Sequence, residues 1–141
     1  MTDFVLHHRL KADTFHVASL PLCELLMMND NQYPWFILVP RQIDCQEIYQ
    51  LSPEDRSQLM NESCLLASIL QEQFKPQKLN IATIGNLVPQ LHMHHVCRYS
   101  TDASWPAPVW GKFPPQAFNP EIASTRISQL QNTLRFALEQ N

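Results

Sequence analysis

Glycine is scarce in this sequence of 141 residues, which contains only Gly85 and Gly111 beside eleven prolines. The glycine-rich loops G-x-G-x-x-G and G-x-x-x-x-G-K-[ST], which cradle phosphates in many nucleotide-binding proteins, are therefore excluded. A phosphate could still bind, but side chains, strand-edge amides or a helix N-terminus would have to hold it.

Long runs of one charge are also absent, and the formal net charge is -3. Nucleic-acid-binding domains usually carry a basic surface, so we expect no sequence-specific nucleic-acid partner. The N-terminal sequence MTDFVLHHRLKADTF lacks the apolar run of a signal peptide, and no stretch is long enough to span a bilayer. We therefore expect a cytoplasmic protein with no membrane partner.

Closely spaced cysteine pairs are absent as well, because the four cysteines lie far apart and no C-x-x-C occurs. A zinc ribbon is unsupported, and a disulfide framework is not expected in a chain that can bury its own core. Cys64 falls in a helical pattern and Cys97 in a strand pattern. We expect both to be small buried residues with reduced thiols.

The composition, with 45% hydrophobic and 16% charged residues, is that of a soluble globular domain. We expect one domain over residues 1–141, with a core at about 14–100 and a tail and helix over 101–141. Apolar runs predict strands at 14–20, 23–28, 35–39, 79–84 and 91–99. The first three lie close together in the sequence, which favours an antiparallel meander.

Three helices complete the prediction, a short one at 4–11, a long one that begins at Ser52 and ends before Pro76, and a last one from about Pro120. Ser52 can cap the long helix and Pro53 suits its first turn. The order of elements predicts an α+β fold with a mostly antiparallel sheet. The apolar helix faces should contain Met60, Cys64, Ala67, Leu70 and Phe74 in the long helix, and Ile127, Leu130, Leu134 and Leu138 in the last.

Half of the six histidines fall within the stretch VPQLHMHHVCR, residues 88–98. Side chains alternate between the two faces of a strand, so Gln90, His92 and His94 should share one face. Leu91, Met93 and His95 should share the other, which the two apolar residues mark as packed.

Three interpretations of this histidine pair compete. His92 and His94 have the H-x-H spacing for one metal ion, but a stable site needs further ligands, and Asp102 is the only acid close in sequence. A polar, solvated sheet face is the plainest alternative. The third interpretation is nucleophilic attack on phosphorus, because neutral imidazole is a good nucleophile near pH 7. Such chemistry needs only positioning and hydrogen-bond donors.

The stretch resembles the signature of the histidine triad (HIT) superfamily, His-φ-His-φ-His-φ-φ with φ apolar, often written VPHLHVHVIPR. The resemblance is free of gaps over 88–98, and YPWFILVPR and LNIATIGN are similar to the family's preceding strands. PQLHxHH and WPAPVWG are similar to a small, stand-alone bacterial branch of HIT hydrolases. The resemblance implies a HIT-like fold over nearly the whole chain, and a homodimer.

The resemblance also implies roles for single residues. His92 would attack an α-phosphate and form a nucleotidyl-histidine, and His94 would contact the phosphate oxygens. Gln90 stands at the family's first histidine, where an amide can hydrogen-bond but cannot carry charge or shuttle a proton. His95 stands at an apolar position of the signature, which suggests a partly buried, hydrogen-bonded role.

Contacts to the rest of the nucleotide are implied for asparagines. Asn29, or alternatively Asn31, matches a residue in the turn before a long strand that contacts the ribose. Asn86 lies in the loop before the triad, among contacts to the phosphate and the leaving group.

Residues outside these positions carry weaker signals. Trp105 and Trp110 are expected to pack over the core or at a dimer interface, or else to line a nucleobase pocket. Arg98 is expected in a surface or interface salt bridge. His7, His8 and His16 have no spacing that points to a site.

The function expected from these residues is hydrolysis or nucleotidyl transfer at the α-phosphate linkage of a dinucleoside polyphosphate or a phosphoramidate, with no cofactor. The alternative is a nucleotide-binding or sensing module with little turnover, because Gln90 replaces a histidine. A metal-binding protein that uses His92 and His94 is the third hypothesis.

Overall fold

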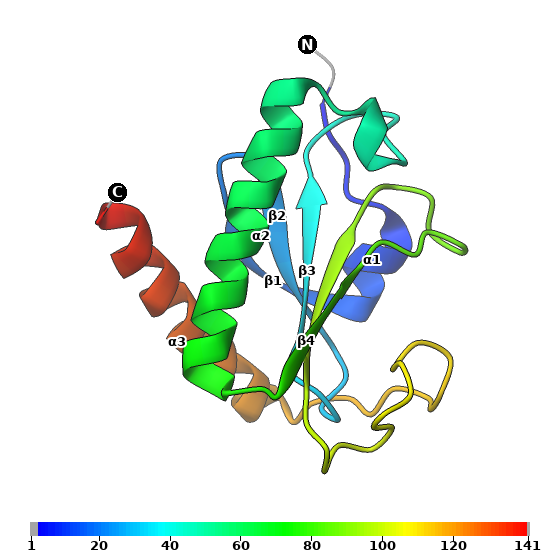
Figure 1. Ribbon diagram of the computed structural model, residues 1–141, viewed down its shortest axis with the longest axis vertical. Coiled ribbons are helices and arrows are strands. Elements are labelled where there is room, and N and C mark those ends of the chain that lie inside the picture. The colour runs from blue at the N-terminus through cyan, green and yellow to red at the C-terminus, as the bar shows by residue number, and fades with distance from the viewer. Residues whose placement is uncertain (1–2, 141) are drawn as a thin grey trace.

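The structure is a computed structural model that describes residues 3–140, and its centre is one five-stranded sheet (Figure 1). The strand order is β1-β2-β3-β5-β4, and every neighbouring pair is antiparallel. The strands are β1 (Thr14–Ser19), β2 (Cys23–Met28), β3 (Trp35–Pro40), β4 (Lys78–Ala82) and β5 (Met93–Arg98). The helices are α1 (His8–Asp13), the 3-10 helix η1 (Ile48–Gln50), α2 (Pro53–Phe74) and α3 (Pro120–Glu139).

The predicted α+β class and the antiparallel meander of the first three strands are confirmed. Helix α2 starts as expected, because Ser52 caps it and accepts a hydrogen bond from the Asp55 amide. It ends at Lys75, whose φ of 50° breaks the helix before Pro76. The first helix was expected at 4–11 but begins only at His8, because the His7 side chain caps it by accepting the Arg9 amide.

The predicted inner face of α2 is confirmed for Leu70, which is buried, and for Phe74, which packs against the core, but it is wrong for Met60 and Cys64. Met60 is 57% exposed and Cys64 is also exposed, whereas the buried positions include Glu62 and Ser63. The reason is that two polar side chains on the inner face have partners there. The Glu62 carboxylate accepts hydrogen bonds from the amides of Leu22 and Cys23 at 2.8 and 2.9 Å. Apolar periodicity misses a helix face whose polar residues are satisfied in this way.

The expected face of α3 is confirmed for Leu130 and Leu134, which are buried. Ile127 is only partly buried. The prediction is wrong for Leu138, which is 42% exposed. Leu138 belongs to the last turn and lines an open groove with Leu20 and Leu65 instead of entering the core.

Two apolar clusters cover the two faces of the sheet. The larger cluster lies between the sheet and the helices α2 and α3, which lie to the left of the strands in Figure 1. The smaller cluster lies on the other face, where α1 contributes Leu10, and the segment after β5 contributes Val109. The candidate histidines belong to this second face. No helix within residues 3–140 is long and apolar enough to cross a membrane.

Candidate functional site

The structure brings His92 and His94 together beside the centre of the sheet. Strand β5 lies between β3 and β4, with His94 opposite Ile37, and His92 immediately precedes the strand. The two imidazole rings lie edge to face, with their centroids 4.9 Å apart. They are only 7% and 4% exposed. Such burial disfavours positive charge on either ring.

Trp35 sets the tautomer of His94. The indole Nε1–H can only donate, and it lies 3.0 Å from Nδ1 of His94. Nδ1 must therefore be the unprotonated nitrogen, and Nε2 carries the proton. Burial, together with the nearby His92 and His95, lowers the pKa of His94 to about 3. His94 is thus a neutral ring whose Nε2–H is available as a donor.

The backbone at Gln90 gives His92 the opposite tautomer. A carbonyl oxygen can only accept, and that of Gln90 lies 2.8 Å from Nδ1 of His92. Nδ1 therefore carries the proton, and Nε2 keeps its lone pair. Burial lowers the pKa of His92, the hydrogen bond to Gln90 opposes this shift, and positive charge on His7 adds to it. The result is a neutral imidazole with a free nucleophilic nitrogen beside a neutral imidazole that can donate.

The side chain of Gln90 binds the N-terminal segment. Its Oε1 accepts the His7 amide at 2.8 Å, and its Nε2 donates to the Val5 carbonyl at 2.9 Å. The carboxamide is therefore engaged with backbone at both ends. The sequence offered no signal for this contact, because the partners are 83 and 85 residues away.

His95 lies on the opposite face, as strand alternation predicts. Its Nε2 is 2.7 Å from the Ser63 hydroxyl and its Nδ1 is 3.2 Å from the Met93 carbonyl, so that the ring donates to Met93 and accepts from Ser63. It is fully buried, and burial lowers its pKa to about 4. His95 therefore joins the sheet to α2 and lies apart from the His92–His94 pair.

The three asparagines lie in different surroundings. Asn29 and Asn31, in the turn after β2, contact the segment before α3 through the Phe118 amide at 2.9 Å and the Ala117 carbonyl at 3.4 Å. Asn86 is exposed in the loop between β4 and β5. Within residues 3–140, no hydrogen bond joins any of them to His92 or His94. Their roles toward a nucleotide stay predictions.

Trp110 completes the aromatic wall of the site. Its ring lies 5.3 Å from His94 and 6.2 Å from Trp35, both edge to face. Its indole Nε1 is buried and has no hydrogen-bond partner within the described part of the chain. A buried donor without a partner costs free energy, so it marks a position where an acceptor on a ligand would be stabilised.

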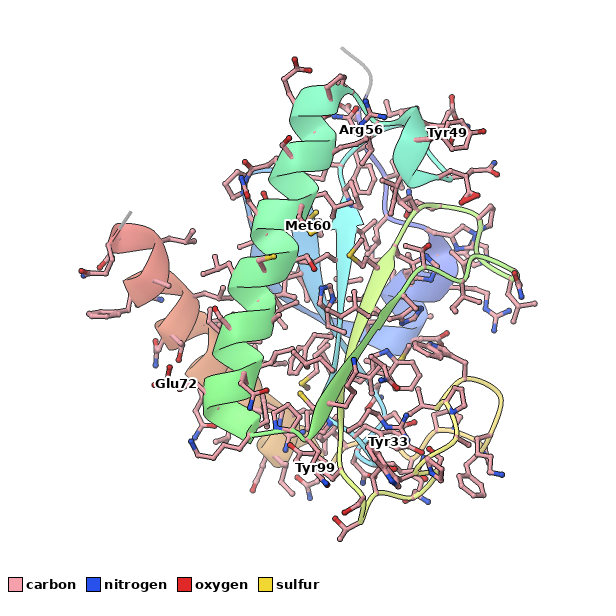
Figure 2. The ribbon with its side chains drawn as sticks, in the orientation of Figure 1. Tyr33, Tyr49, Arg56, Met60, Glu72 and Tyr99 are labelled. Atoms are coloured by element: carbon pink, nitrogen blue, oxygen red, sulfur yellow. The ribbon has the colours of Figure 1, made fainter. Side chains whose placement is uncertain are left out.

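Arg98 contradicts the expectation of a surface ion pair. It is 1% exposed and pairs with Asp102 at 2.8 Å, while it also donates to Asn80 and to the Ala107 carbonyl. Tyr33 and Tyr99, which are labelled near the lower end of the sheet in Figure 2, adjoin this network, because the guanidinium lies over the Tyr33 ring and Asp102 accepts the Tyr99 amide. Its role is to hold the segment after β5 against the sheet. The salt bridge was predicted correctly, but its burial was not.

Metal ligands are not gathered at the site. Among residues 3–140, no group of three or more His, Cys, Asp or Glu side chains is placed to hold a metal ion.

The four cysteines are free; Cys97 is buried as expected, and burial raises its pKa to about 12. Cys64 is exposed, contrary to expectation.

The fold and the site together define an α+β protein whose antiparallel sheet presents two buried, neutral histidines. The HIT domain matches residues 9–101, and the chain belongs to the histidine triad (HIT) family. This superfamily is one of nucleotide-binding proteins and hydrolases. Among curated proteins, none matches this chain.

Solved structures of bacterial histidine triad proteins are similar over almost their whole length. One from Marinobacter aquaeolei VT8 is 46% identical, with a TM-score of 0.92, over 95% of this chain and 98% of its own. One from Bradyrhizobium japonicum is 44% identical, with a TM-score of 0.91, over 93% and 98%. One from Sinorhizobium meliloti 1021 is 36% identical, with a TM-score of 0.89, over 92% and 96%. The resemblance inferred from the sequence is thus confirmed.

Proposed function

We propose that the protein is a nucleotide hydrolase or nucleotidyl transferase that cleaves the α-phosphate linkage of a dinucleoside polyphosphate or a nucleoside phosphoramidate. The observation that supports this proposal best is the complementary pair of tautomers. His92 keeps a lone pair on Nε2, and His94 keeps a proton on Nε2, within one buried cluster. One ring is suited to attack phosphorus while the other donates to a phosphate oxygen.

The first step joins Nε2 of His92 to the α-phosphorus and breaks the bond from phosphorus to the leaving group, which departs with the electron pair. The nitrogen of a phosphoramidate also takes up a proton from solvent and leaves as the neutral amine. The His92 ring becomes positively charged, and the Gln90 carbonyl stabilises it through Nδ1–H. His94 donates from Nε2 to a non-bridging oxygen. The unpartnered N–H of Trp110 is a further donor beside His94. Fixed donors of this kind lower the barrier because they need no reorganisation during the reaction.

The second step releases the nucleotide. Water attacks the same phosphorus, the bond to Nε2 breaks, and its electron pair returns to the ring. One proton from the water passes to solvent, and a nucleoside monophosphate leaves. The covalent intermediate thus divides one difficult displacement into two easier ones.

The test compares wild type with His92→Ala on diadenosine polyphosphates and on adenosine 5′-phosphoramidate. A denaturing alkaline quench followed by mass spectrometry should show a nucleotidyl adduct on His92 in wild type, because the phosphorus–nitrogen bond of such adducts survives base. His16→Ala is the matched control, since His16 is exposed on the outer strand β1. Equal turnover by wild type and His92→Ala would rule out the proposed nucleophile.

A second candidate function is nucleotide binding or sensing with little turnover. The observation that favours it is the engagement of the Gln90 carboxamide with the backbone of Val5 and His7, which leaves that position without an acid or base. Binding of a nucleoside monophosphate in calorimetry, without any covalent adduct on the minute timescale, would favour this alternative.

Assembly as a homodimer and a cytoplasmic location are kept as further proposals, the first from the family resemblance. Sedimentation equilibrium of the full chain measures the first directly. A mass equal to one chain at all concentrations would contradict the homodimer.

A further inference from the structure

One side chain at the site hydrogen-bonds the N-terminal segment, whose Phe4 and Leu6 also pack against the smaller apolar cluster. Gln90 accepts from the His7 amide and donates to the Val5 carbonyl, at 2.8 and 2.9 Å, which is the pairing that a neighbouring strand would make. Val5 itself is 76% exposed, so its contact to Gln90 acts together with the packing of Phe4 and Leu6 in placing the segment. The match to the HIT domain begins at residue 9, so both partners lie outside the matched residues.

This contact brings a third imidazole to the site. His7 and His92 are both hydrogen-bonded to residue 90, His7 through its amide to the side chain and His92 through Nδ1 to the backbone carbonyl, and positive charge on His7 lowers the pKa of His92. Its Nδ1 accepts the Arg9 amide at 3.1 Å, and an amide can only donate. The proton of the neutral His7 ring therefore lies on Nε2. Within residues 3–140 this N–H has no hydrogen-bond partner, and the ring is half-buried.

We propose that the N-terminal segment supplies the imidazole that position 90 lacks: His7 donates from Nε2 to the leaving group, and the Gln90 carboxamide is the positioning residue that holds His7 beside His92. This inference rests on the proposed function. It assigns Gln90 an indirect role, since both ends of its carboxamide already bind the backbone of the N-terminal segment.

The donor acts in the step that breaks the bond from phosphorus to the leaving group. As Nε2 of His92 bonds to phosphorus, negative charge develops on the departing oxygen, which takes the electron pair. The Nε2–H of His7 hydrogen-bonds that oxygen and keeps its proton, so no further acid is needed. A donor to a developing negative charge matters most when the leaving group is poor.

The test therefore varies the leaving group, using the 4-nitrophenyl and phenyl esters of adenosine 5′-monophosphate as substrates. The nitrophenolate departs readily without help, whereas the phenolate is basic and needs a donor. In His7→Ala the ratio of kcat/KM for the phenyl ester to kcat/KM for the nitrophenyl ester should fall by about tenfold or more. His16→Ala should keep the wild-type ratio, because His16 lies on β1, away from β5.

Gln90→Met tests the positioning role, because methionine has a similar length but makes neither hydrogen bond. The same fall in the ratio is expected, and the double variant with His7→Ala should fall no further, since both changes remove one interaction. Hydrogen exchange provides a readout that is independent of turnover. The His7 amide, which donates to Gln90, should be protected in wild type and should lose its protection in Gln90→Met.

The outcomes separate this inference from the proposed function. An unchanged ratio in His7→Ala, or a further fall in the double variant, overturns the role of His7 while turnover through His92 stands. An unprotected His7 amide in wild type overturns the Gln90 contact. Wild-type protein that turns over neither ester, or that matches His92→Ala on both, overturns the proposed function, and the donor role of His7 with it.

Discussion

Trp35 is the residue whose substitution tests the geometry of His94 most directly. Its indole N–H donates to Nδ1 of His94 over 3.0 Å, and the two residues are 8% and 4% exposed. Trp35→Phe keeps an aromatic ring on β3 but removes the donor. The substitution thus leaves a buried imidazole nitrogen without a partner.

Two costs to stability follow from the contacts of Trp35. A buried acceptor without its donor costs about 1–3 kcal/mol, and the smaller ring leaves a void beside Tyr33 and Trp110 that adds roughly 1 kcal/mol. We expect the free energy of unfolding to fall by about 2–4 kcal/mol, measured by urea denaturation.

The catalytic consequence comes from the tautomer of His94. Without the Trp35 donor, Nδ1 of His94 is free to hold the proton, and the Nε2–H donor is no longer fixed. A loss of about 1.4 kcal/mol of transition-state stabilisation corresponds to a tenfold fall in kcat/KM, which is the decrease that we expect.

Nitrogen NMR measures the same event without turnover, because the ¹⁵N shifts of the His94 ring distinguish the protonated nitrogen from the unprotonated one. Trp105→Phe is the control, since Trp105 is 38% exposed and lies under the Arg98 guanidinium, apart from His94. A destabilised Trp35→Phe with wild-type ¹⁵N shifts and wild-type kcat/KM would refute the reasoning.

Three further predictions follow from the same site. Acid should destabilise the fold, because the pKa values of His94 and His95, about 3 and 4, are both lowered mainly by burial. Below about pH 6.5 the unfolded chain binds protons at these histidines that the folded chain does not bind. The free energy of unfolding should therefore fall by roughly 2–4 kcal/mol between about pH 6.5 and pH 5, which urea denaturation would show as lower midpoints. Trp110→Phe removes the unpartnered indole N–H, which we expect to donate to the bound nucleotide, so calorimetry should show nucleoside monophosphate binding weakened by about 0.5–1.5 kcal/mol. An unchanged affinity would exclude a hydrogen bond from Trp110 to the nucleotide. Gln90→His restores the family's histidine but breaks the contact to Val5, so the Val5–His7 segment should exchange its amides faster, and retained protection would contradict the role of Gln90.

The sequence predicted those features of the fold that depend on local pattern. Strand alternation assigned Leu91, Met93 and His95 to the packed face, and all three are buried on the side of α2. Helix starts were also predictable where a cap is encoded in neighbouring residues, as at Ser52. Such features need no knowledge of distant partners.

Features that depend on distant partners were missed for that reason. Glu62 is buried because the amides of Leu22 and Cys23, about 40 residues earlier, satisfy its carboxylate. Arg98 is buried because the loop that follows it folds back to supply Asp102 and a carbonyl. No composition rule anticipates a buried charge whose partners are provided by the tertiary structure.

The site accommodates glutamine in place of the family's first histidine because the tautomers of His92 and His94 do not depend on the side chain at position 90. The tautomer of His92 depends on the backbone carbonyl of residue 90, and any side chain at that position leaves this carbonyl in place. The tautomer of His94 depends on Trp35, which lies on another strand. Neither histidine of the pair relies on the side chain of Gln90, so that side chain is free to bind Val5 and His7. On the proposed function, glutamine at position 90 therefore leaves the nucleophile intact, and on the further inference it also holds the His7 imidazole beside His92.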